Sequence, residues 1–329
     1  MNITKKKFAI DQEDNFLKDI QKFLKKTPVV IIWGSGATIP YGLPSMSDLK
    51  QCLKSELGEL KEETNLETEL GKIHEQSKID KLKELIRKEI LKKDLKCLNK
   101  SIEDDNYLKE IEIMIKIFYK AHPQKIDIIT TNYDQVLEYA LSKLNYNFTD
   151  GFKGRALTKF NPKLFGKKEI INLIKVHGSL NWFFDKNKEV FCLPPENKIN
   201  NLKCAMVLPA EKNKYHETFQ EPYRTLINQS DRVIEKAKSF LVIGFGFNDE
   251  HLTPKIDNKI KKDTPIVIIT KKATDSCKEK LKNANKYCLL EENKENRTKV
   301  TIKTKKNTEE KVFHLQKQYW QIKYFMEVL

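Results

Sequence analysis

Short, mostly apolar runs alternate along this chain with longer amphipathic stretches. A run such as 29–32, with four β-branched residues, is typical of a strand buried on both faces, as in a parallel sheet covered by helices. Strands between helices favour an α/β fold built on an open, mostly parallel, doubly wound sheet. The strands are expected at 29–32, 126–131, 170–176, 205–208, 240–243 and 266–269.

Apolar residues three to four positions apart predict helices over 12–26, 45–60, 133–144 and 218–238. The charged region at about 60–120 has almost no strand signal, so we expect a helical subdomain inserted between the first two strands. The composition of this region does not indicate a catalytic or binding site. It could support the fold, mediate assembly or act as a lid. Two of its helices are marked by Ile79, Leu82, Ile86 and Ile90, and by Leu108, Ile111, Ile115 and Phe118.

The carboxyl-terminal part of the chain has a weaker pattern. Residues 183–193 are typical of a hairpin, and the polar residues 291–311 favour a loop or a weak hairpin. An aromatic-rich tail follows, whose apolar stripe either packs into the core, which we favour, or docks a partner. The stripe consists of Leu315, Tyr319, Ile322 and Phe325. We therefore expect a catalytic domain over 1–290 and a tail over 291–329 that could include a docking helix.

The charge of the chain narrows the possible partners. Its 329 residues include 61 Lys and Arg against 46 Asp and Glu, a net charge of +15. The lysines are scattered along helices rather than gathered with aromatic residues into one stripe, which favours a solvated surface over a nucleic-acid groove. Such a field also attracts anionic ligands, nucleotides included.

The cysteines and the hydropathy of the chain indicate the cellular compartment of the protein. Six cysteines are spread widely and form no C-x-x-C pair, so we expect free thiols in a reducing compartment and no structural metal. The first 16 residues lack the apolar segment of a signal peptide, and no run of about 20 apolar residues occurs that could span a membrane. These features predict a cytoplasmic protein.

A glycine-spaced loop follows the first strand. Gly34, Gly36 and Gly42 stand where the chain must turn sharply. A loop without side chains lets backbone N–H groups approach a phosphate, and a following helix N-terminus adds a partial positive charge. The spacing matches neither the dinucleotide-binding G-x-G-x-x-G nor a P-loop, and an ordinary tight turn is the alternative.

Polar residues follow three other strands. Asn132 and Asp134 come after the second strand, His177 after the third, and the small-residue loop 244–249 after the fifth. Each has a structural explanation, since Asn and Asp cap helices, a histidine can bond within a core, and glycines make turns. The carboxyl ends of parallel strands are, however, where α/β sheets bind ligands, so the coincidence favours one site.

Three ordered motifs carry a family resemblance. The loop 34–44 (G-S-G-A-T, then G-L-P) resembles the sirtuin glycine loop, 130–134 (T-T-N-Y-D) resembles the sirtuin T-Q-N-I-D, and 175–179 (K-V-H-G-S) resembles its H-G motif. With H-G-S-L-N-W and the late I-G-F-G-F-N-D-E-H, the chain is similar to the bacterial sirtuin-like NADases of anti-phage defence. The resemblance covers about residues 29–270 without the helical insertion.

The resemblance implies a Rossmann-like, sirtuin-like fold and NAD⁺ as substrate, cleaved to ADP-ribose and nicotinamide. It implies that Asn132 holds the attacking water and the ribose, that His177 contacts ribose hydroxyls as base or orienter, and that Asp134 positions the nicotinamide carboxamide. The pyrophosphate is expected at Gly34, Ser35, Gly36, Ala37 and Thr38, and the adenosine side at Gly244, Asn248 and Asp249.

Two departures from the family bear on the reaction. The four-cysteine zinc ribbon usual in sirtuin deacylases is absent, and Ser45-Met46-Ser47 replaces the D-F-R that follows the glycine loop. Both weaken the case for a protein deacylase and fit an NAD⁺ glycohydrolase. An NAD-dependent deacylase or ADP-ribosyltransferase remains one alternative, and a non-catalytic nucleotide- or nucleic-acid-binding subunit remains another.

An unregulated NADase would harm its own cell. The resemblance therefore implies an abortive-infection effector that is activated by a partner or a nucleotide signal. We expect a separate sensor or regulatory protein, a homo- or hetero-oligomer, no membrane, and nucleic acid only as an indirect partner.

Overall fold

The structure is a computed structural model that describes residues 16–58, 60, 66–120, 126–195, 202–209, 219–305 and 307–329. The chain divides into two compact units. Unit 1 comprises residues 1–37, 110–128 and 231–329, and unit 2 comprises 38–109 and 129–230. The predicted boundary near residue 290 falls within strand β10 (Tyr287–Asn293), and the functional division it describes stays a prediction.

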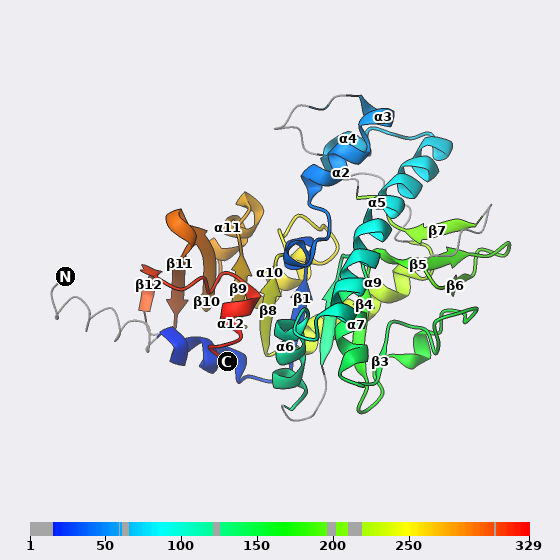
Figure 1. The fold of residues 1–329 in the computed structure, drawn as a ribbon. Helices are drawn as coiled ribbons and strands as arrows, with labels where there is room; N and C mark the ends of the chain where they lie inside the picture. Colours follow the sequence, from blue (N-terminus) through cyan, green and yellow to red (C-terminus); the bar gives the residue numbers. More distant parts are fainter. Residues whose placement is uncertain are drawn as a thin grey trace. The chain divides into compact units, whose positions relative to one another are not determined.

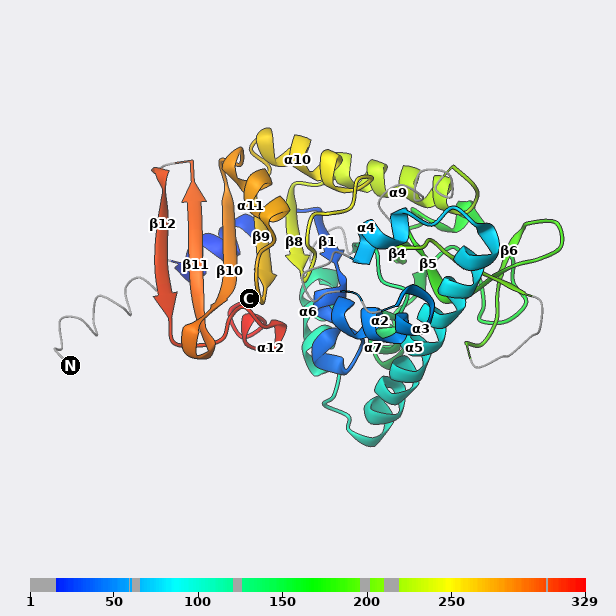
Figure 2. The same cartoon turned by 90° about the horizontal axis from the view of Figure 1, so that it is seen from above.

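Unit 1 is built on a mostly parallel sheet with the strand order β12-β11-β10-β9-β8-β1, followed by the first half of β2 (Asp127–Thr130). Strands β1 (Val29–Trp33), β8 (Ser239–Ile243), β9 (Ile266–Thr270) and β10 pair in parallel, with Ile31 opposite Leu241 and Leu241 opposite Val267. Strands β1, β8 and β9 are buried along almost their whole length, as their apolar sequences predict. Figure 2 shows strands β12 to β8 of this unit side by side. The predicted α/β fold class is confirmed.

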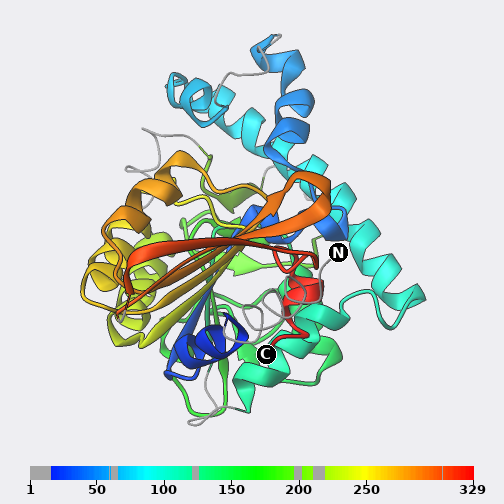
Figure 3. The same ribbon diagram turned by 90° about the vertical axis from the view of Figure 1, so that its left-hand side faces the viewer.

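Helices cover both faces of this sheet. A helix over 16–24 lies on one face, where Phe16 packs its ring 5.7 Å from that of Phe313, and α11 (Asp275–Lys282) lies on the other (Figure 3). The first residues of the helix predicted over 12–26 lie outside the described residues. Unit 1 also contains α10 (Thr253–Lys261), most of α6 (Lys109–Tyr119) and the short α12 (Ile322–Phe325).

The end of the chain is part of the unit 1 sheet. Strands β11 (Arg297–Thr304) and β12 (Asn307–Leu315) form an antiparallel hairpin beside β10, so the hairpin reading of 291–311 is confirmed and the loop reading is wrong. The four residues of the predicted apolar stripe are at most 6% exposed, as the core alternative predicts.

Unit 2 contains the second half of β2, β4 (Ile171–Lys175) and β3 (Phe148–Thr149), in the order β2-β4-β3. A separate antiparallel sheet has the order β6-β5-β7, and its β5–β6 hairpin confirms the prediction for 183–193. Its strands are β5 (Gly178–Phe184), β6 (Val190–Cys192) and β7 (Lys203–Met206). Helix α7 (Val136–Lys143) follows β2, and α9 (Tyr223–Lys236) begins in this unit.

The described residues between β1 and β2 form helices joined by turns and loops and contain no strand, as predicted for the insertion. Its longest element is α5 (Gln76–Glu103), the cyan helix of Figure 1. The helix predicted over 45–60 is instead two helices, α2 (Met46–Cys52) and α3 (Lys54–Leu57), because the chain leaves helical geometry at Leu53. The described part of the predicted insertion also contains α4 (Leu66–Gly71) and α6, most of which belongs to unit 1. No helix in the described part of the chain is long and apolar enough to cross a membrane.

Candidate functional site

In unit 1, the glycine loop after β1 packs against the loop after β8, backbone against backbone. Gly34 N–H donates to Ile243 O at 2.9 Å, and Gly36 N–H donates to Gly244 O at 3.0 Å. A Cβ atom on Gly34 would lie 2.4 Å from Gly244 O, and one on Gly244, whose φ is +59°, would lie 2.2 Å from Ala37 N. The glycines are therefore required for this close approach, which also engages the amides of Gly34 and Gly36 within the protein.

The loop after β8 has two kinds of predicted site residue. Asn248 is exposed, whereas Asp249 is 4% exposed. Asp249 Oδ1 accepts from the N–H groups of His251 at 3.0 Å and Leu252 at 2.9 Å, directly before α10. The Asp249 side chain thus holds the turn that leads into α10, and its predicted contact with adenosine stays a prediction.

In unit 2, three predicted site residues form one hydrogen-bonded cluster. Thr38 Oγ1 donates to Asp134 Oδ2 at 3.2 Å, and Asn132 Nδ2 donates to Thr38 Oγ1 at 3.3 Å. All three residues are at most 7% exposed. Asn132 N–H donates to Thr130 Oγ1 at 3.0 Å, which fixes the turn at the end of β2. The amide and the carboxyl group therefore have defined orientations before any ligand binds.

The segment with His177 lies next to the Asn132 segment. Tyr133 O accepts from Leu180 N–H at 3.1 Å and from Ser179 Oγ at 3.3 Å, and Tyr133 Oη donates to Val207 O at 2.6 Å. Val207 N–H in turn donates to His177 O at 2.9 Å. The structure thus brings together the two strand ends whose side chains were predicted to act on the glycosidic bond. Their roles stay predictions.

A buried ion pair supports the Asp134 turn. Lys175 Nζ donates to Glu138 Oε1 at 2.6 Å and to Asp134 O at 2.6 Å, and Lys175 and Glu138 are 1% and 3% exposed. Burial raises the pKa of Asp134 from 3.8 to about 6, Lys175 opposes this rise, and Glu138 adds to it. Sequence reasoning missed Lys175 and Glu138, although a lysine at the end of the apolar run 171–175 was an available signal.

The predicted site residues therefore form two groups. Unit 1 holds Gly34, Ser35, Gly36, Ala37, Gly244, Asn248 and Asp249, and unit 2 holds Thr38, Asn132, Asp134 and His177. Within each group the loops that carry these residues are joined by the hydrogen bonds described above.

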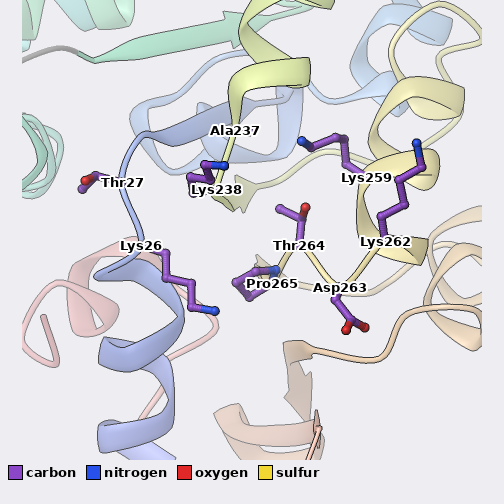
Figure 4. Close-up of a pocket in the computed structure, with 9 residues that line it drawn as sticks. All are labelled: Lys26, Thr27, Ala237, Lys238, Lys259, Lys262, Asp263, Thr264 and Pro265. Atoms are coloured by element: carbon purple, nitrogen blue, oxygen red, sulfur yellow. The ribbon is translucent and has the colours of Figure 1, made fainter.

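One cavity of unit 1 lies at the opposite end of its strands. It has a volume of about 500 Å³ and is lined by the residues that precede β1, β8 and β9 (Figure 4). Four lysines line it, but Lys259 Nζ already donates to Glu235 O at 2.7 Å. Asp263, also in the lining, is paired with Lys286 and Lys305. This cavity contains none of the predicted site residues, because those follow the carboxyl ends of the strands.

The cysteines and acidic groups provide no metal site in the described chain. All six cysteines are free thiols. Among the residues that the structure describes, no three His, Cys, Asp or Glu side chains are placed to hold a metal ion.

A family model described as a SIR2-like domain matches residues 127–306, more than half of the chain. The chain belongs to this SIR2-like family. The matched range contains Asn132, Asp134 and His177 together with the 244–249 loop, whereas the glycine loop precedes it. No curated protein matches the chain.

Among solved structures, the SIR2-like chain is similar to a Sir2 homologue solved as an NAD complex, with 16% identity, a TM-score of 0.46, and coverage of 84% of this chain and 87% of that one. A structure described under the mechanism and regulation of Sir2 enzymes has 14% identity and a TM-score of 0.43, and the match covers 80% of this chain and 89% of that one.

Proposed function

We propose that this SIR2-like protein is an NAD⁺ glycohydrolase that releases nicotinamide and ADP-ribose. The observation that carries the proposal is the buried, hydrogen-bonded cluster of Thr38, Asn132 and Asp134 beside the His177 segment. Of these residues, Asn132, Asp134 and His177 lie within the range that the family model matches. An amide, a carboxyl group and an imidazole from two adjoining strand ends are the groups that can orient a ribose and a water molecule.

The proposed reaction does not require a covalent bond between the substrate and the protein. The glycosidic C–N bond of NAD⁺ breaks with its electron pair going to the pyridinium nitrogen, so nicotinamide leaves as a neutral molecule. The ribose carbon becomes oxocarbenium-like, water adds to it, and the water proton is lost to a base. In this proposal Asn132 positions the water, His177 orients the ribose hydroxyls and takes up the proton, and Asp134 orients the carboxamide. Catalysis then comes mainly from positioning.

The proposal is tested by incubating purified protein with NAD⁺ and quantifying nicotinamide and ADP-ribose. Asn132→Ala and His177→Ala are expected to abolish turnover and to keep the wild-type circular dichroism spectrum. The matched controls are Asn283→Ala and His74→Ala, which replace exposed side chains outside both groups of site residues and should keep full turnover. Wild-type protein that consumes no NAD⁺, alone and with the products of neighbouring genes, would overturn the proposal.

Family membership fits an NAD-dependent deacylase equally well, so the same assay includes an acylated lysine peptide. Acyl-ADP-ribose formed at the expense of the peptide would establish the deacylase, whereas ADP-ribose formed at the same rate without peptide supports the glycohydrolase. The missing cysteine ribbon and the Ser45-Met46-Ser47 sequence favour the second result. NAD⁺ binding without turnover, or salt-dependent DNA binding alone, would instead indicate a non-catalytic subunit.

We further propose that the activity serves anti-phage defence in the cytoplasm and is held off until a sensor protein or a nucleotide signal activates it. The support is the motif resemblance and the cost that uncontrolled NAD⁺ loss imposes on a cell. Phage challenge of cells that express the wild-type protein should lower NAD⁺ and stop phage spread, while Asn132→Ala should do neither. Equal protection by both proteins would remove NAD⁺ cleavage from the defence.

A further inference from the structure

Helix α5 of the insertion has two buried ionisable side chains, one acidic and one basic, on one face. Its buried stripe begins with Ile79, Leu82, Ile86 and Ile90 and continues with Asp94, Cys97 and Ser101. Asp94 is 0% exposed, and Arg87, seven residues earlier and therefore two turns away on the same side, is 5% exposed. Burying two such groups is costly unless each is well bonded, so their partners are informative.

Asp94 holds the segment that follows Asn132 and Asp134. Its Oδ1 accepts from Gln135 N–H at 2.8 Å, and its Oδ2 accepts from Tyr139 Oη at 2.5 Å. Gln135 is the residue directly before α7, so Asp94 satisfies an amide at the start of that helix in the way a capping side chain does. One carboxylate of the insertion therefore fixes both the turn and the first part of α7.

Arg87 holds the segment that follows His177. Its Nε donates to Leu180 O at 3.0 Å, its Nη2 donates to Pro195 O at 2.7 Å, and its guanidinium lies 5.0 Å from the centre of the Phe183 ring. Leu180 N–H is itself bonded to Tyr133 O, within the Asn132 segment. The two charged residues of α5 thus connect to the two adjoining strand ends of unit 2, one each.

We propose that Arg87 and Asp94 are positioning residues through which helix α5 holds the Asn132 and His177 segments in register, so that the helical insertion sets the activity of the site. The effect on activity depends on the proposed function, whereas the effect on the two segments does not. A force or partner that shifts α5 acts on both segments at once, which gives the insertion a regulatory role that its composition did not reveal.

Hydrogen exchange on the full-length protein tests the structural part without any need for turnover. Asp94→Ala should raise the exchange of peptides covering 131–139 on the order of tenfold or more, since the amide of Gln135 loses its hydrogen bond to the Asp94 carboxyl group. Asp94→Asn keeps an acceptor for that amide and should exchange like the wild type. Arg87→Ala should raise exchange over 178–184, and Arg87→Lys should not restore it, because an ammonium cannot reproduce the forked, stacked geometry.

Steady-state kinetics test the effect on activity. Asp94→Ala should lower kcat on the order of a hundredfold with little change in KM, because a small displacement of reacting groups is enough for such a loss. Asp94→Asn should restore kcat. Ser101→Ala is a buried change on the same helix that removes a hydroxyl bonded within α5 to Leu98 O at 2.7 Å, and it should keep kcat. Leu281→Ala on α11 should lower stability without lowering kcat per folded molecule.

Wild-type exchange in Asp94→Ala over 131–139 would overturn the proposal, whatever the activity. So would a loss of kcat that Asp94→Asn fails to restore, or one that Leu281→Ala reproduces at equal loss of stability. A wild type without NAD⁺ turnover would refute the proposed function alone, and the exchange experiment would still decide the role of α5.

Discussion

The contact between the two glycine loops of unit 1 makes a graded prediction about stability and NAD⁺ binding. Gly244→Ala combines two penalties, because φ at this residue is +59° and the new Cβ would lie 2.2 Å from Ala37 N. Gly34→Ala meets only a clash, 2.4 Å from Gly244 O. Gly42→Ala meets only the backbone penalty, since its φ is +86° and no atom lies within 4 Å of the new Cβ. The three variants separate strain from close approach.

The expected losses of unfolding free energy follow from these two terms. A left-handed backbone costs an alanine about 1–2 kcal/mol, and forcing extra volume into a packed contact costs about 1–3 kcal/mol. Gly42→Ala should therefore cost about 1–2 kcal/mol and Gly34→Ala about 1–3 kcal/mol or more, because both clashing groups are backbone. Gly244→Ala should cost roughly 2–5 kcal/mol, the sum of both.

Urea denaturation followed by circular dichroism gives the stabilities, and calorimetric titration with NAD⁺ gives the affinities. Gly244→Ala and Gly34→Ala should weaken NAD⁺ binding beyond their effect on stability, because they push apart the loops proposed to carry the pyrophosphate and the adenosine side. Gly42→Ala should bind NAD⁺ like the wild type. The reasoning fails if Gly42→Ala is as damaging as Gly244→Ala, since the clash would then have no separate effect.

Three further changes test the buried groups of unit 2. Burial raises the pKa of Asp94 from 3.8 to about 7, so its protonated form stabilises the fold below about pH 4 and this contribution is lost as the pH rises to about 7. Urea denaturation across pH 4–8 should show Asp94→Asn gaining stability on the wild type over that interval, and parallel curves would contradict this. Lys175→Met should lower the free energy of unfolding by about 3–5 kcal/mol, because it leaves the Glu138 carboxylate buried alone. Adding Glu138→Gln should recover part of that loss. If the double variant were as unstable as Lys175→Met, the two side chains would not be coupled. Gly178→Ala places a Cβ 2.0 Å from Ala205 O at a φ of +85°, so thermal unfolding should show a clear drop in melting temperature; a wild-type value would mean that the backbone there relaxes freely.

The sheet was predictable where the sequence alone marks burial. Runs such as 29–33 and 266–270 are apolar because both of their faces are covered, so no tertiary information is needed to recognise them. Helices α10 and α11 were missed because each buries only a few apolar positions among lysines; α11 buries Cys277 and Leu281 alone among its described residues. Strand β10 was missed because its last residues are polar, and its place in the sheet depends on pairing with β9 and β11.

The candidate site was predictable only as far as its motifs extend. Asn132, Asp134 and His177 follow strands that the pattern identifies, so their place at strand ends could be inferred before the structure. The residues that hold these side chains in place could not be inferred in this way. A chain with 61 Lys and Arg residues gives no local sign that Arg87, on a helix rich in lysine, is among its buried ones. Burial of a charge depends on partners far away in sequence, and periodicity does not report them.

Hydrogen bonds from four other segments hold the turn after β2 in place. Thr38 bonds the Asp134 carboxyl group, Lys175 bonds its carbonyl, Asp94 bonds the next amide, and Leu180 N–H bonds Tyr133 O. A reaction that depends on orientation benefits from such restraint. Of the four supports, Asp94 alone belongs to a helix of the insertion rather than to a loop or strand that contains or adjoins a predicted site residue. Evolution or a partner can therefore change Asp94's position without touching the residues proposed to contact NAD⁺, which makes α5 the element where control of activity is physically easiest to add.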